Sequence, residues 1–297
     1  MRYLLSIGGV TIAINVDSNA DARTIAPLGG PVAQFAFSGE KPADVEVRVR
    51  PMEESAERSA QCAEVFDSGS LWRLFADGAD YRIEFRSSFS GDEPYKIAQV
   101  AKAGDGLTVD LQTRVTEYAN TYALQFPLDE LLVNAVLTRQ GGMELHSCGV
   151  VDRNGDGYLF AGNSGGGKTT TARLWQREAK EILSDDRIIL RRENGQWWMY
   201  GTPWHGEAEI CSASRAPLRR IFLLDKATRN ELRPLSQAAA IARLFSCTFP
   251  PFYDADGMSA VVGTLAEIVR DVPVAAFAFV NDRSAVDFVR DAFEVAA

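Results

Sequence analysis

The sequence lacks the features that mark membrane, nucleic-acid-binding and disulfide-linked proteins. No apolar run approaches the roughly 20 residues that a membrane-spanning helix needs. Lysine and arginine number 31 against 40 aspartates and glutamates, and the net charge of −9 argues against a nucleic-acid or anionic-membrane surface, since both need dense basic patches. The four cysteines are far apart and form no C-x-x-C pair, which indicates neither a disulfide framework nor a zinc site. We therefore expect a cytoplasmic protein with reduced thiols and with no nucleic-acid or membrane partner.

The chain changes character near Pro127. Before it, short runs that alternate apolar and polar residues predict a β-rich region of antiparallel character. Gly8-Gly9 interrupts the first apolar stretch and favours a hairpin over a signal peptide. The expected strands cover residues 3–7, 10–16, 45–49, 71–75, 81–85, 96–100 and 107–111, with surface connections at 43–44 and 51–60. We predict a β-rich N-terminal region over residues 1–126.

After Pro127, helical patterns and buried-strand patterns alternate. Proline in the first turn and acidic residues next to it favour a helix over residues 127–139. Further strands are expected at 144–151, 157–161, 181–190, 197–200, 221–224 and 274–280, and helices at 170–179, 235–245 and 284–293. This order is typical of an α/β domain, which we assign to residues 127–297.

The most specific motif is a phosphate-binding loop at residues 162–169, which matches G-x-x-x-x-G-K-[ST] at every fixed position. A buried strand precedes the loop and a helix follows it, so the helix N-terminus adds a favourable dipole for phosphate. Lys168 places a point charge at the outer phosphates of ATP, and the Thr169 hydroxyl is a ligand for Mg²⁺. The nucleotide-binding residues are predicted to be Gly162, Asn163, Ser164, Gly165, Gly166, Gly167, Lys168, Thr169 and Thr170. The alternative is a glycine-rich turn that binds no nucleotide.

A second candidate is the pair Asp185-Asp186, within the apolar stretch 181–190. Two carboxylates in a buried strand are costly to desolvate unless a metal or a proton transfer uses them. Beside a phosphate loop, one acid suits Mg²⁺ and another suits an acceptor hydroxyl. Adjacent strand residues point to opposite faces, so the two acids need not share one role unless the strand ends there. The alternative is an exposed strand end with solvated acids.

Together these motifs resemble the catalytic domain of HPr kinase/phosphorylase, whose P-loop fold is related to that of the ATP-dependent phosphoenolpyruvate carboxykinases. The loop 162–169, the sequence Ser184-Asp-Asp-Arg187 and the histidine-bearing stretch 145–152 carry the resemblance. It covers roughly residues 140–225. The glycine-rich signature that follows the acidic ligand in the family is absent, and residues 1–126 do not resemble the usual N-terminal domain. HPr as the acceptor, and reversal with phosphate, are therefore not expected.

The resemblance implies transfer of the ATP γ-phosphoryl group to a hydroxyl, with serine of a protein or peptide as the acceptor. Asp186 would accept the hydroxyl proton, and Asp185 would bind the metal with Glu207 as a further ligand. Glu209 is the alternative to Glu207, and the roles of the two aspartates are interchangeable at this level. His146 would hold one aspartate in place or assist proton transfer, with a buried structural histidine as the alternative. The family also implies homo-oligomers.

Other functions remain open from the sequence alone. A nucleotide-binding regulator or scaffold would keep the phosphate loop without transferring phosphate, and a small-molecule kinase would use the same residues on another acceptor. No N-K-x-D motif of GTPases is present. His205 has no counterpart in the family, and Trp204 fits either a site residue or a core tryptophan. The aromatic stretch 249–253 favours a packed loop over an acceptor groove.

Overall fold

The computed structural model describes residues 1–16, 25–26, 28–52, 61–87, 93–114 and 121–294. Most of the expected connection at 51–60 lies outside these ranges. The chain divides into two compact units, Met1–Val136 and Leu137–Ala297. The predicted boundary after residue 126 falls ahead of helix α1 (Leu128–Leu137), almost all of which belongs to the first unit. Among the described residues, no helix combines the length and apolar character needed to cross a bilayer.

The first unit is built on one large mixed sheet with strand order β1-β2-β4-β9-β8-β7-β6-β5. Its elements are β1 (Arg2–Ile7), β2 (Val10–Val16), β3 (Ile25–Ala26), the 3-10 helix η1 (Gly30–Phe35), β4 (Val45–Pro51), β5 (Cys62–Asp67), β6 (Trp72–Asp77), β7 (Asp80–Phe85), β8 (Lys96–Ala103), β9 (Gly106–Thr113), β10 (Thr121–Tyr122) and α1. The expected strands are present, but the sheet is not antiparallel throughout, because β4 pairs in parallel with both β2 and β9. Strand β5 was not predicted, since most of its side chains are exposed and no alternation marks it.

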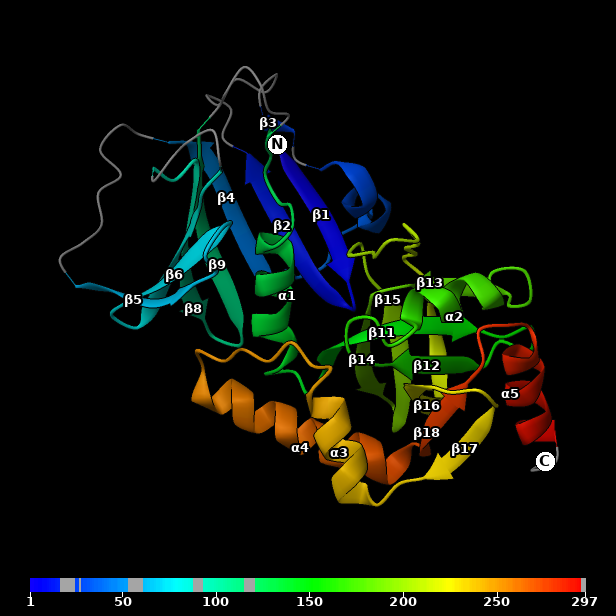
Figure 1. The fold of residues 1–297 in the computed structure, drawn as a ribbon. Coiled ribbons are helices and arrows are strands. Elements are labelled where there is room, and N and C mark those ends of the chain that lie inside the picture. The colour runs from blue at the N-terminus through cyan, green and yellow to red at the C-terminus, as the bar shows by residue number, and fades with distance from the viewer. Residues whose placement is uncertain (17–24, 27, 53–60, 88–92, 115–120, 295–297) are drawn as a thin grey trace. The chain divides into compact units, whose positions relative to one another are not determined.

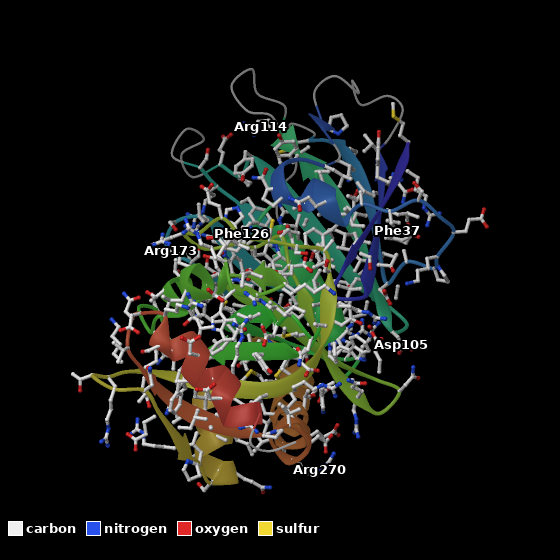
Figure 2. The ribbon with its side chains drawn as sticks, turned by 90° about the vertical axis from the view of Figure 1, so that its right-hand side faces the viewer. Phe37, Asp105, Arg114, Phe126, Arg173 and Arg270 are labelled. Atoms are coloured by element: carbon white, nitrogen blue, oxygen red, sulfur yellow. The ribbon has the colours of Figure 1, made fainter. Side chains whose placement is uncertain are left out.

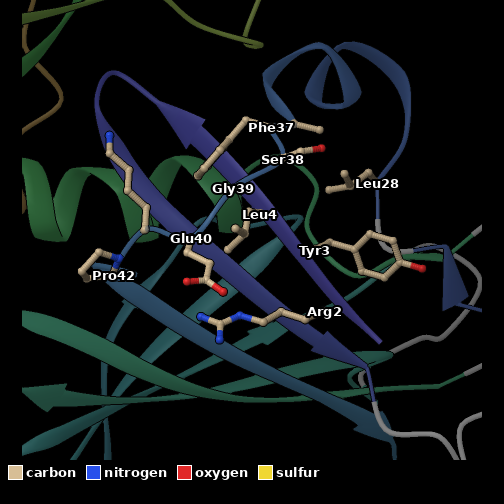
Figure 3. Close-up of a pocket in the computed structure, with 11 residues that line it drawn as sticks. Arg2, Tyr3, Leu4, Leu28, Phe37, Ser38, Gly39, Glu40 and Pro42 are labelled. Carbon is tan, nitrogen blue, oxygen red and sulfur yellow. The ribbon is translucent and has the colours of Figure 1, made fainter.

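Tight turns join neighbouring strands of this sheet. Gly8 and Gly9 link β1 to β2 with φ angles of 56° and 79°, which confirms the expected hairpin and explains why glycine stands at both positions. Asp105 lies in the turn between β8 and β9 (Figure 2). An open pocket of about 990 Å³ lies beside β1 and the segment 36–42 (Figure 3). It contains none of the site residues predicted from the sequence.

Lys96 is a buried amine at the start of β8. It is 1% exposed, and its Nζ donates hydrogen bonds to the carbonyl oxygens of Tyr122 at 2.9 Å and Ala123 at 3.4 Å. Burial lowers the pKa of Lys96 to about 8, and the charge of Asp129 opposes that effect. The side chain therefore fixes the segment before α1 to the sheet at a cost in desolvation of the charged form.

Replacing Lys96 by Met is expected to remove a pH dependence of stability. Between about pH 8 and 10.5, the unfolded chain binds more protons at this lysine than the folded chain does. The contribution of Lys96 to stability therefore rises with pH in this range. It is complete above 10.5 and is lost as pH falls through 8. The wild type should gain up to about 3 kcal/mol over this range relative to Lys96→Met. Denaturant titrations of both proteins at several pH values measure the difference. Parallel stability curves would show that Lys96 titrates normally.

The second unit carries a sheet in which five strands close into a ring. Its elements are β11 (Met143–Val151), β12 (Gly157–Ala161), α2 (Lys168–Trp175), β13 (Glu181–Ser184), β14 (Arg187–Glu193), β15 (Gln196–Gly201), β16 (Arg215–Lys226), β17 (Glu231–Pro234), α3 (Gln237–Phe245), α4 (Ala255–Asp271), β18 (Val274–Phe279) and α5 (Ser284–Glu294). The order is β12-β11-β14-β15-β16-β18-β17, and β12 also pairs in parallel with β16. Strand β12 is therefore bonded on both sides, to β11 and to β16.

Helices cover this sheet on two faces (Figure 1). Leu244 of α3 and Val261, Leu265 and Ile268 of α4 pack into one apolar cluster, whereas α2 and α5 contribute to a second cluster with the aromatic residues of β12, β16 and β18. Helix α4 was not predicted from the sequence. Asp254 caps it by accepting hydrogen bonds from the backbone N–H groups of Asp256 and Gly257, and Arg270 lies near its other end (Figure 2).

The expected strand 181–190 is two strands, because the chain turns at the aspartate pair. Ser184 Oγ accepts hydrogen bonds from the N–H groups of Asp186 and Arg187, both at 3.2 Å, which bends the backbone there. Strand β11 pairs with β13 through one half of its length and with β14 through the other. The bend therefore lies opposite His146, in the middle of β11.

Candidate active site

Strand β11 brings the predicted site residues together. His146 pairs with Arg187 on one side, and the next residue, Ser147, pairs with Ala161 at the end of β12 on the other. The N–H of Ser147 donates a hydrogen bond to the carbonyl oxygen of Asp186 at 2.8 Å. His146 and Ser147 of β11 are thus bonded to two parts of the site. One is the end of β12, where the phosphate loop begins, and the other is the bend that carries the aspartates.

The phosphate loop has the backbone geometry that its glycines predict. Gly165 and Gly167 have φ angles of 74° and 107°, and Gly167 precedes the first turn of α2. A Cβ atom on Gly166 would lie 2.8 Å from the carbonyl oxygen of Asn163, and one on Gly167 would lie 2.6 Å from the ring of Phe279. Larger residues at these two positions would therefore distort the loop.

Lys168 lies against the loop. It is 5% exposed, and its Nζ donates hydrogen bonds to the carbonyl oxygens of Gly162 at 3.0 Å and Asn163 at 3.3 Å. Burial lowers the pKa of Lys168, and the negative charge of Asp186 acts in the opposite direction. The amine is therefore held between the loop and the acid. Thr169 and Thr170, which follow it in the first turn of α2, are half-buried.

Asp185 holds the loop 201–214 in place. The carboxylate is fully buried and accepts three backbone hydrogen bonds, from Gly206 at 2.9 Å, Ala208 at 2.9 Å and Ile210 at 3.3 Å. These bonds satisfy a charge that would otherwise be costly to bury. Asp185 therefore positions this loop, and its oxygens are already engaged. Its predicted role as a metal ligand stays a prediction.

Gly206→Ala should disturb this arrangement. The new Cβ would lie 2.8 Å from Asp185 Oδ2 and 3.2 Å from Asp186 Cβ, and the carboxylate cannot move without losing its backbone donors. We expect a loss of about 1–3 kcal/mol in stability, measured by denaturant unfolding. Gly263→Ala is the matched control: its Cβ meets nothing within 4 Å on helix α4, so it should stabilise by about 0.5–1 kcal/mol. Equal effects of both changes would contradict the role assigned to Gly206.

Asp186 has other partners than Asp185 and is partly accessible. Its side chain is 23% exposed, with Oδ1 2.9 Å from His146 Nε2 and Oδ2 2.8 Å from Arg187 Nη1. Burial alone would raise the pKa of Asp186, but the hydrogen bond from His146 and the charges of Arg187, His146 and Lys168 outweigh it and hold that pKa below its ordinary value. Asp186 is therefore an ionised, fixed carboxylate within electrostatic reach of Lys168.

Arg187 connects Asp186 to Glu144, which the sequence did not single out, and to Phe249 of the aromatic stretch 249–253. Its Nε lies 3.2 Å from Oε1 of Glu144, whose side chain is fully buried, and its guanidinium lies 4.1 Å from the centre of the Phe249 ring. The Phe249 ring also meets the His146 ring edge-on, at 6.0 Å between centroids. Both neighbours of Asp186 are therefore held in place by the same aromatic side chain.

Three further residues considered from the sequence lie on the loop that Asp185 holds. Glu207 and His205 are exposed on the loop 201–214, and Trp204 is buried there with an indole N–H that has no partner among the described residues. Within the described part of the chain, no group of three or more His, Cys, Asp or Glu side chains is arranged to hold a metal ion. Glu207 as a metal ligand stays a prediction.

Comparison with known proteins gives distant likenesses. A family model described as SynChlorMet cassette protein ScmC matches residues 120–251, less than half of the chain, a range that includes the phosphate loop, both aspartates and Phe249. No curated protein matches the chain. Among solved structures, the HPr(Ser) kinase/phosphatase from Coxiella burnetii is similar over 43% of this chain and 92% of its own, with 12% sequence identity and a TM-score of 0.22. A TM-score this low assigns no fold.

Proposed function

We propose that the chain is an ATP- and Mg²⁺-dependent kinase that transfers the γ-phosphoryl group to a hydroxyl, with serine of a protein or peptide as the acceptor. One observation carries the proposal: a phosphate loop with its lysine, and an ionised aspartate bonded to a histidine, meet beside the same strand. Phosphoryl transfer needs mainly positioning and charge neutralisation, and this arrangement offers both. The requirement for ATP agrees with the expected cytoplasmic location.

In this proposal, the loop N–H groups bind the β-phosphate, and Lys168 leaves the carbonyl oxygens of Gly162 and Asn163 to contact the β- and γ-oxygens. The Thr169 hydroxyl fits a Mg²⁺ ligand beside phosphate oxygens and water, and the ion would neutralise phosphate charge. The carboxylate of Asp185 already accepts three N–H hydrogen bonds, so one of its four lone pairs is left for the ion.

Asp186 would act as the base. Each carboxylate oxygen has two lone pairs, so Asp186 can keep its bonds to His146 and Arg187 and still accept a hydroxyl proton. The acceptor oxygen forms a bond to the γ-phosphorus, the bond from that phosphorus to the β–γ bridging oxygen breaks, the proton moves to Asp186, and ADP leaves. His146 would keep the carboxylate aimed at the hydroxyl.

Acceptor dependence tests the proposal. The protein is incubated with γ-labelled ATP and Mg²⁺, with and without peptides and proteins from the producing cell. Label in an acceptor, with ATP consumption that rises when the acceptor is added, supports a hydroxyl kinase. ATP hydrolysis that is independent of any acceptor indicates an ATPase, and tight ATP binding with no product indicates a nucleotide-binding regulator.

A further inference from the structure

Residues 245–253, here called the aromatic segment, are fixed beside the first residues of β11. The N–H of His146 donates a hydrogen bond to the carbonyl oxygen of Cys247 at 2.7 Å, and Leu145 forms an antiparallel bridge with Thr248. The N–H of Phe249 donates to the carbonyl oxygen of Glu144 at 3.4 Å. The segment is therefore part of the sheet edge next to His146, and not a separate surface loop.

The same segment reaches the phosphate loop. Ser246 Oγ lies 3.4 Å from Asn163 Oδ1, and the Cys247 thiol lies 3.9 Å from the same oxygen. In the middle of the segment, Phe249 packs on Arg187 and His146, the two residues that hold Asp186. The segment thus contacts both the loop that would bind nucleotide and the residues that hold Asp186, the proposed base.

The chemistry of the segment is apolar. It contains four aromatic residues and two prolines and no charged residue, in a chain whose charged fraction is 24%. Phe245 is 36% exposed and Phe252 is 49% exposed, while Phe249 is half-buried between them in sequence. Exposed aromatic side chains beside a polar site are typical of surfaces that bind a partner.

The segment is also rigid. Pro250 and Pro251 have fixed φ angles, and the N–H groups of Phe252 and Asp254 donate to the carbonyl oxygens of Pro250 at 2.8 Å and Pro251 at 2.9 Å. Asp254 then caps helix α4, which anchors the end of the segment. A surface that is already ordered loses little conformational entropy when a ligand binds.

We propose that the aromatic segment is the acceptor-binding wall of the site, and that it selects a peptide whose acceptor serine is flanked by an apolar side chain. The inference rests on the proposed kinase function and names the chemistry of its acceptor. An apolar side chain beside the serine would pack on Phe249 and Phe252 and bring the hydroxyl next to Asp186. A charged neighbour would lose its hydration against a segment that contains no charged residue, and the Arg187 guanidinium beside Phe249 is already bonded to Asp186 and Glu144.

A serine-centred peptide library with random flanking positions tests the inference. The library is labelled with γ-labelled ATP and Mg²⁺, and kcat/KM is then measured for a matched pair of peptides with leucine or aspartate beside the serine. We expect the leucine peptide to be favoured about tenfold. Phe252→Ala should reduce this preference to near unity, whereas Val262→Ala, an equally exposed apolar residue at 48% on α4, should leave it unchanged.

The outcomes separate the two proposals. Phosphorylation of the library without apolar enrichment, or equal effects of Phe252→Ala and Val262→Ala, would overturn the acceptor wall and leave the kinase function in place. A protein that binds Mg²⁺ and ATP and labels no member of the library would overturn both.

Discussion

Asp186→Asn should reduce phosphoryl transfer by about 10³-fold while ATP binding stays within a few-fold of wild type. The amide cannot accept the hydroxyl proton, and general-base catalysis contributes about 10²–10⁴-fold. Asparagine has nearly the same shape and can retain a hydrogen bond to His146 or Arg187, so the fold and the nucleotide loop should be unaffected. Single-turnover transfer of labelled phosphate and equilibrium ATP binding measure the two quantities separately.

Asp105→Asn is the matched control for this change, because Asp105 is exposed in the β8–β9 turn of the first unit (Figure 2). It should retain full activity. Transfer by Asp186→Asn within tenfold of wild type would exclude Asp186 as the base. Equal loss of binding and transfer would instead assign Asp186 to nucleotide binding.

Lys168→Ala is the second change with a large expected effect. Loss of the ammonium removes charge-assisted hydrogen bonds to phosphate, so ATP affinity should fall about 10–100-fold. Transfer at saturating ATP should fall by a further 10²–10³-fold, because the charge that develops on the γ-phosphoryl group loses a fixed cation. The variant also leaves the carbonyl oxygens of Gly162 and Asn163 without this donor.

Lys180→Ala removes the same charge from an exposed position after α2 and serves as the control. Titration calorimetry with ATP and a transfer assay at high ATP distinguish the two effects of Lys168→Ala. Unchanged affinity together with unchanged transfer would mean that the loop 162–169 does not bind nucleotide in the manner proposed.

The features that could be predicted from the sequence are those that depend on residues close together in the chain. The phosphate loop depends on glycines and a lysine at fixed spacing, so its strand–loop–helix context could be predicted without tertiary contacts. The strands of the first sheet could be predicted where one face is buried and side chains alternate. Strand β5 has no such alternation, because most of its residues are exposed.

The contacts around Asp186 could not be predicted, because they are made by single residues at distant positions. Glu144, Arg187 and Phe249 lie on β11, on β14 and in the aromatic segment, and only the folded sheet brings them together around Asp186. The stretch 249–253 was interpreted as a packed loop, and Phe249 does pack on Arg187 and His146, but nothing in the sequence indicates these partners. The bend at the aspartate pair was also unpredictable, since it depends on Ser184 and on N–H groups from residues 206–210.

Helix α4 could have been predicted, because the sequence contains both an N-cap residue and the apolar spacing of a helix. Asp254 is a favourable N-cap, and Val261, Leu265 and Ile268 recur at the spacing of one helical face. The glycines at 257 and 263 lower its intrinsic helix propensity, and tertiary packing of the apolar face compensates for them.

The two-sided bonding of β12 has a consequence for ligand binding. A strand that is hydrogen-bonded to β11 on one side and β16 on the other cannot shift its register without breaking both ladders. The loop 162–169 that follows it therefore starts from a fixed position relative to His146 and the aspartates. Most of the entropy of ordering this part of the site is lost when the chain folds, so the nucleotide binding proposed above should carry only a small additional ordering cost.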